Sequence, residues 1–224
     1  MIKLTHSFML TCIDPKGLLK NCNKLSTFMD RLNKQATKKA TGGDGEIDKK
    51  IENTYKGDGF ELLTEAIVRM FGADPLIQIH PDSYEIVDLA DDNGVDATGI
   101  GNNGLMHTIQ CKYFSDGRHE LKANESRLTN FTSKSLMPIN SGGYGVDANY
   151  KCPDGGKRVK GKSNMTIFHT GKGFHHHTQE HMMCNIVRDV NRKDIERRIN
   201  NNNIFWLLFR TSWESYILKI KNGE

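Results

Sequence analysis

No stretch of this 224-residue sequence approaches the ~20 consecutive apolar residues that a membrane-spanning helix needs. The first residues contain one lysine and no small-residue cleavage site, so we expect no secretory signal peptide. These two absences predict a cytoplasmic protein with no membrane partner. The chain is also long enough to bury a core, which removes the need for disulfides or a structural metal.

Closely spaced cysteines are absent as well. The five cysteines are scattered and never in Cys-x-x-Cys spacing, which argues against a disulfide framework and for a reducing compartment. The His-Glu-x-x-His frame of many zinc enzymes is also missing. His177 and His181 are four residues apart, a spacing that suits zinc on one helical face. A structural zinc site in this histidine-rich segment therefore stays open as an alternative.

Charge is distributed unevenly in a chain whose net charge is only +4. Acidic residues gather around residues 82–96, whereas Lys and Arg dominate residues 151–172 and 188–198. An acidic site beside basic surfaces suits a protein that cuts a polyanion with a bound metal. The side chains expected to contact DNA are Lys157, Arg158, Lys160, Lys162, Lys172, His175, His176, Arg192 and Lys193. The alternative is that these charges form an ordinary solvated face.

Three parts are expected along the chain. Residues 1–45 form an N-terminal helical arm, residues 46–190 form a core that includes a long basic loop at 141–163, and residues 191–224 form a C-terminal helical extension. The arm is either an appendage for DNA binding or dimerisation, or a helix that packs on the core.

Apolar periodicity predicts the order of the elements. Helices are expected at 15–39, at 60–71 after an opening Gly57-Asp58-Gly59, at 121–136, at 178–187, at 192–199 and at 204–220. Strands are expected at 76–79, 84–89, from residue 95, at 106–114 and at 165–169, the third and fourth being joined in a hairpin by the turn at 101–104. This order predicts an α/β domain with a mixed central sheet.

The residues with the clearest chemistry lie on the two strands of the hairpin. Because side chains alternate along a strand, Gln110 and Lys112 share one face and Cys111 points the other way, into the core. Asp96, the Gln110 amide and the Cys111 carbonyl offer oxygen atoms of the kind that hold Mg²⁺. Lys112 beside them is able to orient or deprotonate a water molecule. Taken singly, Asp96 is more typical of a turn and Lys112 of a solvated strand.

A further carboxylate is expected from the helix before these strands. Glu61 is the candidate, and Glu65 and Asp58 are alternatives on the same helix.

Gly57-Asp58-Gly59-Phe60-Glu61, Gly94-Val95-Asp96 and Gln110-Cys111-Lys112-Tyr113 together resemble the PD-(D/E)xK nuclease superfamily. The resemblance is closest to its Mrr-type restriction endonuclease and Holliday-junction-resolvase-like branch, where the strand motif often reads Gln-x-Lys. It covers roughly residues 56–187 and implies a restriction-endonuclease-like αβββαβ core that cleaves DNA with Mg²⁺, for which Mn²⁺ is an expected substitute.

The resemblance also assigns roles to residues. It implies Asp96, Gln110 and the Cys111 carbonyl as metal ligands, Lys112 as the catalytic lysine and Glu61 as an accessory acid and metal ligand. Gln110 stands where the superfamily expects an acid, which lowers the negative charge of the site.

The sequence therefore predicts a Mg²⁺-dependent DNA endonuclease, of a sequence-specific homing or restriction type. A Holliday-junction or branched-DNA resolvase, and a non-catalytic DNA-binding module with or without zinc, are the alternatives. The expected partners are double-stranded or branched DNA and a second copy of the chain, because cutting both strands of a duplex needs two sites.

Overall fold

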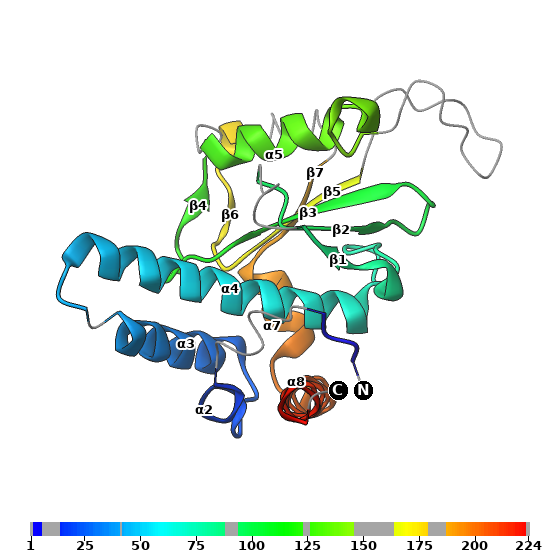
Figure 1. The fold of residues 1–224 in the computed structure, drawn as a ribbon. Helices are drawn as coiled ribbons and strands as arrows, with labels where there is room; N and C mark the ends of the chain where they lie inside the picture. Colours follow the sequence, from blue (N-terminus) through cyan, green and yellow to red (C-terminus); the bar gives the residue numbers. More distant parts are fainter. Residues whose placement is uncertain are drawn as a thin grey trace.

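The computed structural model describes most of the chain. The described ranges are 2–5, 14–40, 42–87, 94–122, 126–145, 164–178 and 187–222. They form an α/β fold in which helix α5 (Ser126–Leu136) covers one face of a mixed five-stranded sheet and helix α4 (Gly45–Phe71) covers the other (Figure 1). Four further helices lie on the α4 side, and they are α2 (Pro15–Leu19), α3 (Leu25–Lys39), α7 (Arg192–Ile199) and α8 (Asn203–Lys221) (Figure 1). No helix in these ranges is long and apolar enough to cross a membrane.

The sheet has the strand order β1-β2-β3-β5-β7. Its strands are β1 (Glu85–Ile86), β2 (Ala97–Ile100), β3 (Met106–Lys112), β5 (Asn164–His169) and β7 (Val187–Val190). The first three pair antiparallel, and β5 and β7 continue the sheet parallel to β3. The expected mixed sheet is thus confirmed. A second, two-stranded sheet joins β4 (Glu120–Leu121) and β6 (Gly173–Phe174) in parallel.

The predicted hairpin and the strand after it are confirmed. Ala97 pairs with Ile109 across β2 and β3, and Lys112 pairs with His169 across β3 and β5. The glycine- and asparagine-rich turn between β2 and β3 includes Gly104 at a φ of 75°, a conformation that glycine adopts without strain.

Several predicted boundaries on the sheet side are wrong. Leu121 was expected to begin a helix, but with Glu120 it forms β4, because the two residues pair with β6, and α5 begins only at Ser126. Val187 was expected to end a helix, yet it begins β7, which pairs with residues 165–168 of β5. The rest of that predicted helix, residues 179–186, lies outside the described part. The predicted strand at 76–79 is reduced to one bridge between Ile79 and Gly101.

Two hydrophobic clusters fill the space on the two faces of the sheet. The α5 side is filled by Val95, Leu121, Leu128, Phe131, Met165 and Ile167. The α4 side is larger, and its cluster runs without interruption from Phe28 of α3 through Phe60 of α4 and Ile109 of β3 to Trp213 of α8. Each such side chain contributes about 1.5–3 kcal/mol when buried. The N-terminal arm and the C-terminal extension therefore both pack on the core.

The helices on the α4 side differ from the prediction in two places. The helix expected over residues 15–39 is divided into α2 and α3, and Asn21 between them has a φ of 53°. The second helix does not open at residues 57–59 but at Gly45, where Asp44 accepts hydrogen bonds from the amides of Glu46 and Ile47. The two glycines at 57 and 59 lie inside α4, so the helix start expected there was wrong.

Gly59 has a packing role that explains its place inside a helix. A Cβ atom at this position would lie 2.5 Å from Cδ1 of Leu32, a fully buried residue of α3. The glycine lets α3 and α4 approach closely enough to share one cluster. At Gly57, by contrast, a Cβ would meet nothing within 4 Å.

We predict opposite effects for the two glycines. Gly59→Ala should destabilise the protein by about 1–3 kcal/mol, since Leu32 must move within a close-packed core. Gly57→Ala, two residues away on the same helix, should stabilise it by about 0.5–1 kcal/mol through the better helix propensity of alanine. Urea unfolding of the two variants measures both changes. Equal effects of the two substitutions would contradict a close contact that is specific to Gly59.

Candidate active site

Asp96 is fixed against strand β3 by two hydrogen bonds. Its amide donates to the carbonyl of Ile109 at 2.9 Å, and its Oδ2 accepts from the amide of Cys111 at 2.5 Å. The second bond places the carboxylate beside the Gln110–Lys112 peptide segment. Gly94, two residues earlier, has a φ of 90°, which glycine tolerates best. The structure thus brings Asp96 and the Gln-x-Lys motif together, as their positions in the hairpin predicted.

The strand alternation predicted for Gln110, Cys111 and Lys112 is confirmed. The Cys111 side chain packs against the α4-side cluster. Gln110 is 1% exposed, and its Nε2 donates to the carbonyl of Gly94 at 2.6 Å. Lys112 follows two residues later and is half-buried at the end of β3. The amide of Gln110 therefore also anchors the turn that leads into Asp96.

Cys111 contributes to the site through its main chain. Burial raises the pKa of its thiol well above the ordinary value, and the negative charges of Asp96 and Glu61 raise it further. A thiol that stays protonated is a poor metal ligand and nucleophile. The carbonyl oxygen remains the group by which Cys111 can bind a cation.

Glu61 reaches the same region from helix α4. It is half-buried, and its charge acts together with that of Asp96 on Cys111 and on Tyr84, whose pKa is raised mainly by burial. Two carboxylates from different elements thus lie near enough to Cys111 to raise the pKa of its thiol. That Glu61 and Asp96 belong to one metal site stays a prediction.

The two alternative acids on α4 have different surroundings. Glu65 is fully buried, and its Oε1 accepts from the Thr5 amide at 2.8 Å and from Nη2 of Arg69 at 3.2 Å. It therefore holds the N-terminal segment against α4. Asp58 lies one turn before Glu61, and burial raises the pKa of its carboxyl to about 6. A carboxyl that titrates near neutral pH is a candidate for proton transfer.

The donor atoms at this site suit a hard cation such as Mg²⁺. Carboxylate oxygens of Asp96 and Glu61 and the Cys111 carbonyl are the types of ligand that Mg²⁺ prefers. Within the described ranges, no group of three or more His, Cys, Asp or Glu side chains is arranged to hold a metal ion. A cation here would therefore depend on amide and main-chain oxygens of β3 in addition to the two carboxylates.

A buried histidine lies next to Lys112 on the neighbouring strand. His169 pairs in register with Lys112, its Nε2 lies 2.6 Å from Oδ1 of Asp189, and its Nδ1 accepts from the Gly171 amide at 3.2 Å. Both ring nitrogens are used within the fold, so His169 orients the turn after β5. This pair could not be predicted from the sequence, because Asp189 lies in the unpredicted strand β7.

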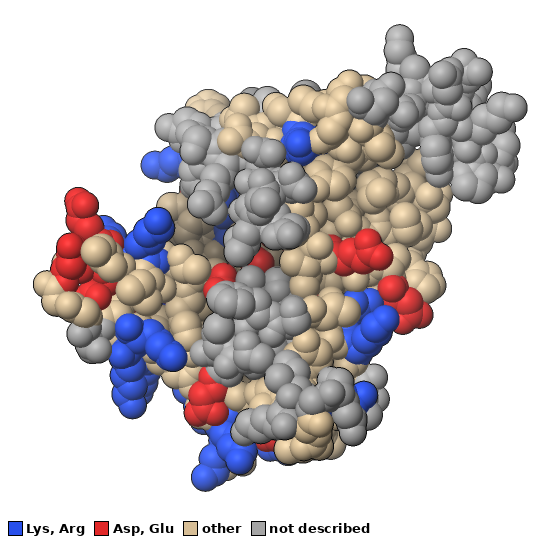
Figure 2. Space-filling model, in the orientation of Figure 1, with Lys and Arg blue, Asp and Glu red and all other residues tan. Residues whose placement is uncertain are grey.

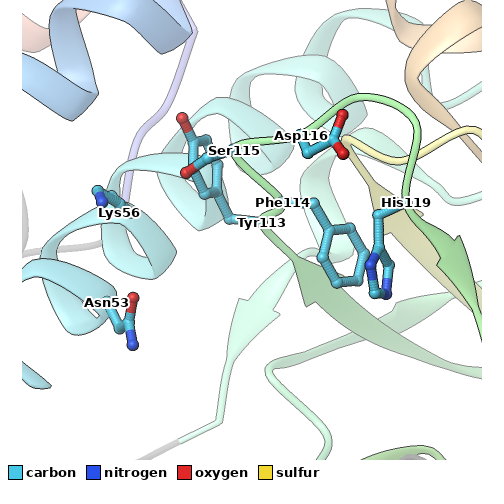
Figure 3. Close-up of a pocket in the computed structure, with 7 residues that line it drawn as sticks. All are labelled: Asn53, Lys56, Tyr113, Phe114, Ser115, Asp116 and His119. Carbon is cyan, nitrogen blue, oxygen red and sulfur yellow. The ribbon is translucent and has the colours of Figure 1, made fainter. Parts of the chain in front are cut away.

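A pocket opens directly beyond Lys112. It has a volume of about 310 Å³ and lies between α4 and the segment that follows β3 (Figure 3). Its lining residues are Asn53, Lys56, Tyr113, Phe114, Ser115, Asp116 and His119. The rings of Phe114 and His119 stack with centroids 4.0 Å apart, across the pocket from Asn53 and Lys56 (Figure 3). Of these lining residues, only Tyr113 and Phe114, which directly follow Lys112, were expected near the site from the sequence.

The residues expected to bind DNA are only partly described. Lys157, Arg158, Lys160 and Lys162 lie outside the described residues. Lys172 bonds Glu120 at 3.0 Å, Arg192 bonds Glu196 at 2.8 Å, and Lys193 is exposed. On the face shown in Figure 2, described Lys and Arg side chains lie in separate groups among acidic ones. The DNA contacts therefore stay a prediction.

Among the described residues of the histidine-rich segment, no group of side chains is arranged to hold a zinc ion. The rings of His175, His176 and His177 are neighbours, with centroids 3.8 to 5.5 Å apart. His181, which the zinc alternative pairs with His177, lies outside the described residues.

No protein-family model, no curated protein and no solved structure matches this chain. The chemistry of the site therefore has to be inferred from Asp96, Glu61 and the residues of β3 themselves.

Proposed function

We propose that the protein is a Mg²⁺-dependent DNA endonuclease of the PD-(D/E)xK type. The observation that carries the proposal is the hydrogen bond from the Cys111 amide to Asp96 Oδ2, which fixes a carboxylate beside the Gln-x-Lys segment. The charge of Glu61 at the same segment adds a second acid. Mg²⁺, or Mn²⁺ in its place, is the cofactor that this set of oxygen donors would hold.

Each residue of the site has a role in this proposal. Asp96, Glu61, the Cys111 carbonyl and the Gln110 amide oxygen would hold the cation, which supplies charge for the phosphate and for an attacking water. Lys112 orients that water and stabilises the charge that develops on the phosphate. The amide of Gln110 also bonds Gly94, so it positions the Asp96 turn whether or not it contacts the cation.

The order of elements supports the same proposal. Helix α4 precedes the antiparallel strands β1, β2 and β3, and α5 then leads to β5, which is parallel to β3. This is the αβββαβ order that a restriction-endonuclease-like core requires. The site lies where β2 begins and β3 ends, so its residues come from neighbouring ends of two paired strands.

The proposal is tested by incubating the full chain with supercoiled plasmid DNA in Mg²⁺, in Mn²⁺ and in EDTA. Nicked or linear product with either metal and none in EDTA is expected. DNA binding without cleavage in any metal would instead support the non-catalytic module. Stoichiometric zinc in the purified protein would support its zinc-stabilised form.

The pocket beyond Lys112 favours a second candidate, which is cleavage of branched DNA. Stacked rings at Phe114 and His119 offer an aromatic wall, and Asn53 and Asp116 offer polar groups that can bond the edge of an unpaired base. Stacking of one base on an aromatic side chain contributes about 1–3 kcal/mol. A nucleotide next to the cut could enter such a pocket only if it is unpaired.

We therefore predict a substrate-dependent effect of His119→Ala. The variant should cut a flap or four-way junction roughly ten-fold more slowly than the wild type, since it loses a stacking surface. Its rate on intact duplex should be unchanged. The matched control is His80→Ala, an exposed histidine at the opposite end of β2, and the measurement is the single-turnover rate on each substrate. Equal losses on both substrates, or none, would contradict a pocket for an unpaired base.

A further inference from the structure

Arg69 joins helix α4 to the segment that leads into strand β1. Its Nη1 donates to the carbonyl of Pro81 at 2.5 Å, and its Nη2 donates to the carbonyl of Tyr84 at 2.9 Å. The side chain is only 4% exposed, and its Cζ lies 5.6 Å from the centroid of the Tyr84 ring. A guanidinium presents its N–H donors in a rigid planar fork, so these contacts fix both the distance and the orientation of the segment relative to α4.

The same side of α4 carries the acid that is proposed to hold the cation. Glu61, Glu65 and Arg69 follow one another at intervals of four residues, so they lie on one side of the helix. Nη2 of Arg69 also bonds Oε1 of Glu65 at 3.2 Å, and Glu65 is fully buried. Arg69 is therefore held in place by the residue that stands between it and Glu61.

Strand β1 connects Arg69 with Asp96. The strand pairs antiparallel with β2, and directly after it the amide of Val87 donates to the carbonyl of Asp96 at 3.1 Å. This amide lies only three residues after the Tyr84 carbonyl that Arg69 holds, and an extended chain has little freedom over so short a distance. Burial raises the pKa of the Tyr84 hydroxyl, and the charges of Glu61 and Asp96 are among those that raise it further, so Tyr84 lies near both acids.

Stability alone does not account for the ion pair of Glu65 and Arg69. Burying two charges costs desolvation that their attraction offsets only in part, and apolar residues of similar size often serve a fold equally well. Oε2 of Glu65 and Nε of Arg69 are also buried without a hydrogen-bond partner among the described residues, which adds to the cost. The pair does supply direction, since Glu65 holds the guanidinium where it meets the two carbonyls.

We propose that Arg69 is a positioning residue of the site, and that by tying β1 to α4 it sets the position of Asp96 relative to Glu61. Its guanidinium is buried and engaged by Glu65 and two carbonyls, so it acts through β1 and not by contact with DNA. This assignment rests on the proposed function, because the spacing of the two acids matters only if they hold one cation. It follows that the affinity for Mg²⁺ depends on a residue that is not a ligand.

Arg31 provides a matched control with the same chemistry. Its Nη1 donates to the main-chain carbonyls of Leu18 at 3.0 Å and of Lys20 at 2.5 Å, so it joins α3 to α2 and its end. Neither α2 nor α3 carries a residue of the proposed metal site. Substitution by lysine keeps the charge but loses the rigid fork, so both Arg69→Lys and Arg31→Lys should lose stability, and only Arg69→Lys should disturb Asp96.

Amide hydrogen exchange of the full chain, measured by NMR without metal or DNA, tests this directly. The amides of Cys111 and Val87 are both bonded to Asp96, and in Arg69→Lys they should exchange roughly ten-fold faster relative to the slowest amides of the same variant. The double variant Glu65→Gln/Arg69→Gln removes both buried charges together and should show the same change. Unchanged exchange of the two amides in these variants, or an equal change in Arg31→Lys, would overturn the proposal.

Cleavage gives a second measurement that a purely structural role would not move. Arg69→Lys should raise the Mg²⁺ concentration for half-maximal cleavage roughly ten-fold, while the rate at saturating Mg²⁺ stays near that of the wild type, because the ligands themselves are retained. A lower rate with an unchanged Mg²⁺ dependence would overturn the positioning role. A wild type that cuts no DNA would overturn the proposed function, and the exchange rates would still decide whether Arg69 positions Asp96.

Discussion

Lys112→Ala should slow DNA cleavage by roughly 10²–10⁴-fold while DNA binding is retained. The lysine follows the Gln110–Cys111 segment to which Asp96 is bonded, so its amine is the group that can reach a water or a phosphate there. Removing it leaves both carboxylates in place, and for this reason the loss should appear in the rate of the chemical step. The single-turnover cleavage rate at saturating Mg²⁺ measures this step.

A second substitution separates two roles of the lysine. Lys112→Arg keeps a positive charge, but the guanidinium does not lose its proton in proteins. A variant that retains most of the activity would indicate that the lysine acts by charge and orientation, and one as slow as Lys112→Ala would indicate proton transfer. Lys49→Ala, at an exposed lysine near the start of α4, is the matched control. If Lys112→Ala cuts at the wild-type rate, Lys112 is not a catalytic residue.

Acid should destabilise the protein through His107 by about 1.4 kcal/mol for each pH unit below 6.5. Burial lowers the pKa of this histidine to about 3, and the charge of Arg188 contributes. The folded state therefore keeps it neutral, with Nε2 2.6 Å from Oγ1 of Thr166, whereas the unfolded chain takes up a proton near its ordinary pKa of 6.5. The contribution of His107 to the free energy of unfolding is therefore lost as the pH falls from 6.5 toward 3.

Two carboxyl groups oppose this trend. Burial raises the pKa of Asp58 to about 6 and raises that of Glu65, so these groups bind protons more readily in the folded state and favour folding as the pH falls. The contribution of His107 is therefore best measured as a difference. Urea unfolding at several pH values between 7 and 4.5 measures the free energy of unfolding of wild type and of His107→Gln. The difference between the two should change steadily in favour of the variant as the pH falls. Parallel curves would show that His107 is not held neutral, and His80→Gln, at an exposed histidine, is the control.

Local signals in the sequence predicted a large part of the fold. The helix over 192–199 and the hairpin of β2 and β3 were expected where they are found, because each has a short, complete pattern of its own. The strand β5 was expected from the short, mostly apolar stretch Met165–His169, which is followed by a glycine-containing break. These elements need no distant residue to be recognised.

Contacts between distant residues explain the errors. Gly59 signals a helix start in the sequence, but its actual role depends on Leu32, 27 residues earlier in the chain. The segment Val187–Val190 has a valine at each end and two charged residues between them, so it shows no alternating pattern typical of a strand. It forms a strand because it pairs with β5. The strands β4 and β6 are two residues each, and neither carries a periodic signal.

The same distinction applies to the site. The proximity of Asp96 to Gln110 and Lys112 could be predicted, since strand alternation and a tight hairpin fix it. Two other features could not be predicted: the pairing of His169 with Asp189, and the pocket formed by α4 and the segment after β3. Each joins elements that lie far apart in the sequence. The bond from Gln110 to Gly94 adds a structural role to a residue that the sequence marked only as a ligand.

Cleavage of supercoiled plasmid by wild type and by Asp96→Asn, measured in parallel in Mg²⁺ and in EDTA, tests the proposed site most directly. The substitution keeps the size of the side chain and the hydrogen bond that its oxygen can accept from the Cys111 amide, but it removes the negative charge that would hold the cation. We predict Mg²⁺-dependent cleavage by the wild type and a loss of at least roughly 100-fold in the variant, with the fold and DNA binding retained. No cleavage by the wild type, or cleavage by Asp96→Asn at the wild-type rate, would contradict a metal-dependent nuclease site at Asp96.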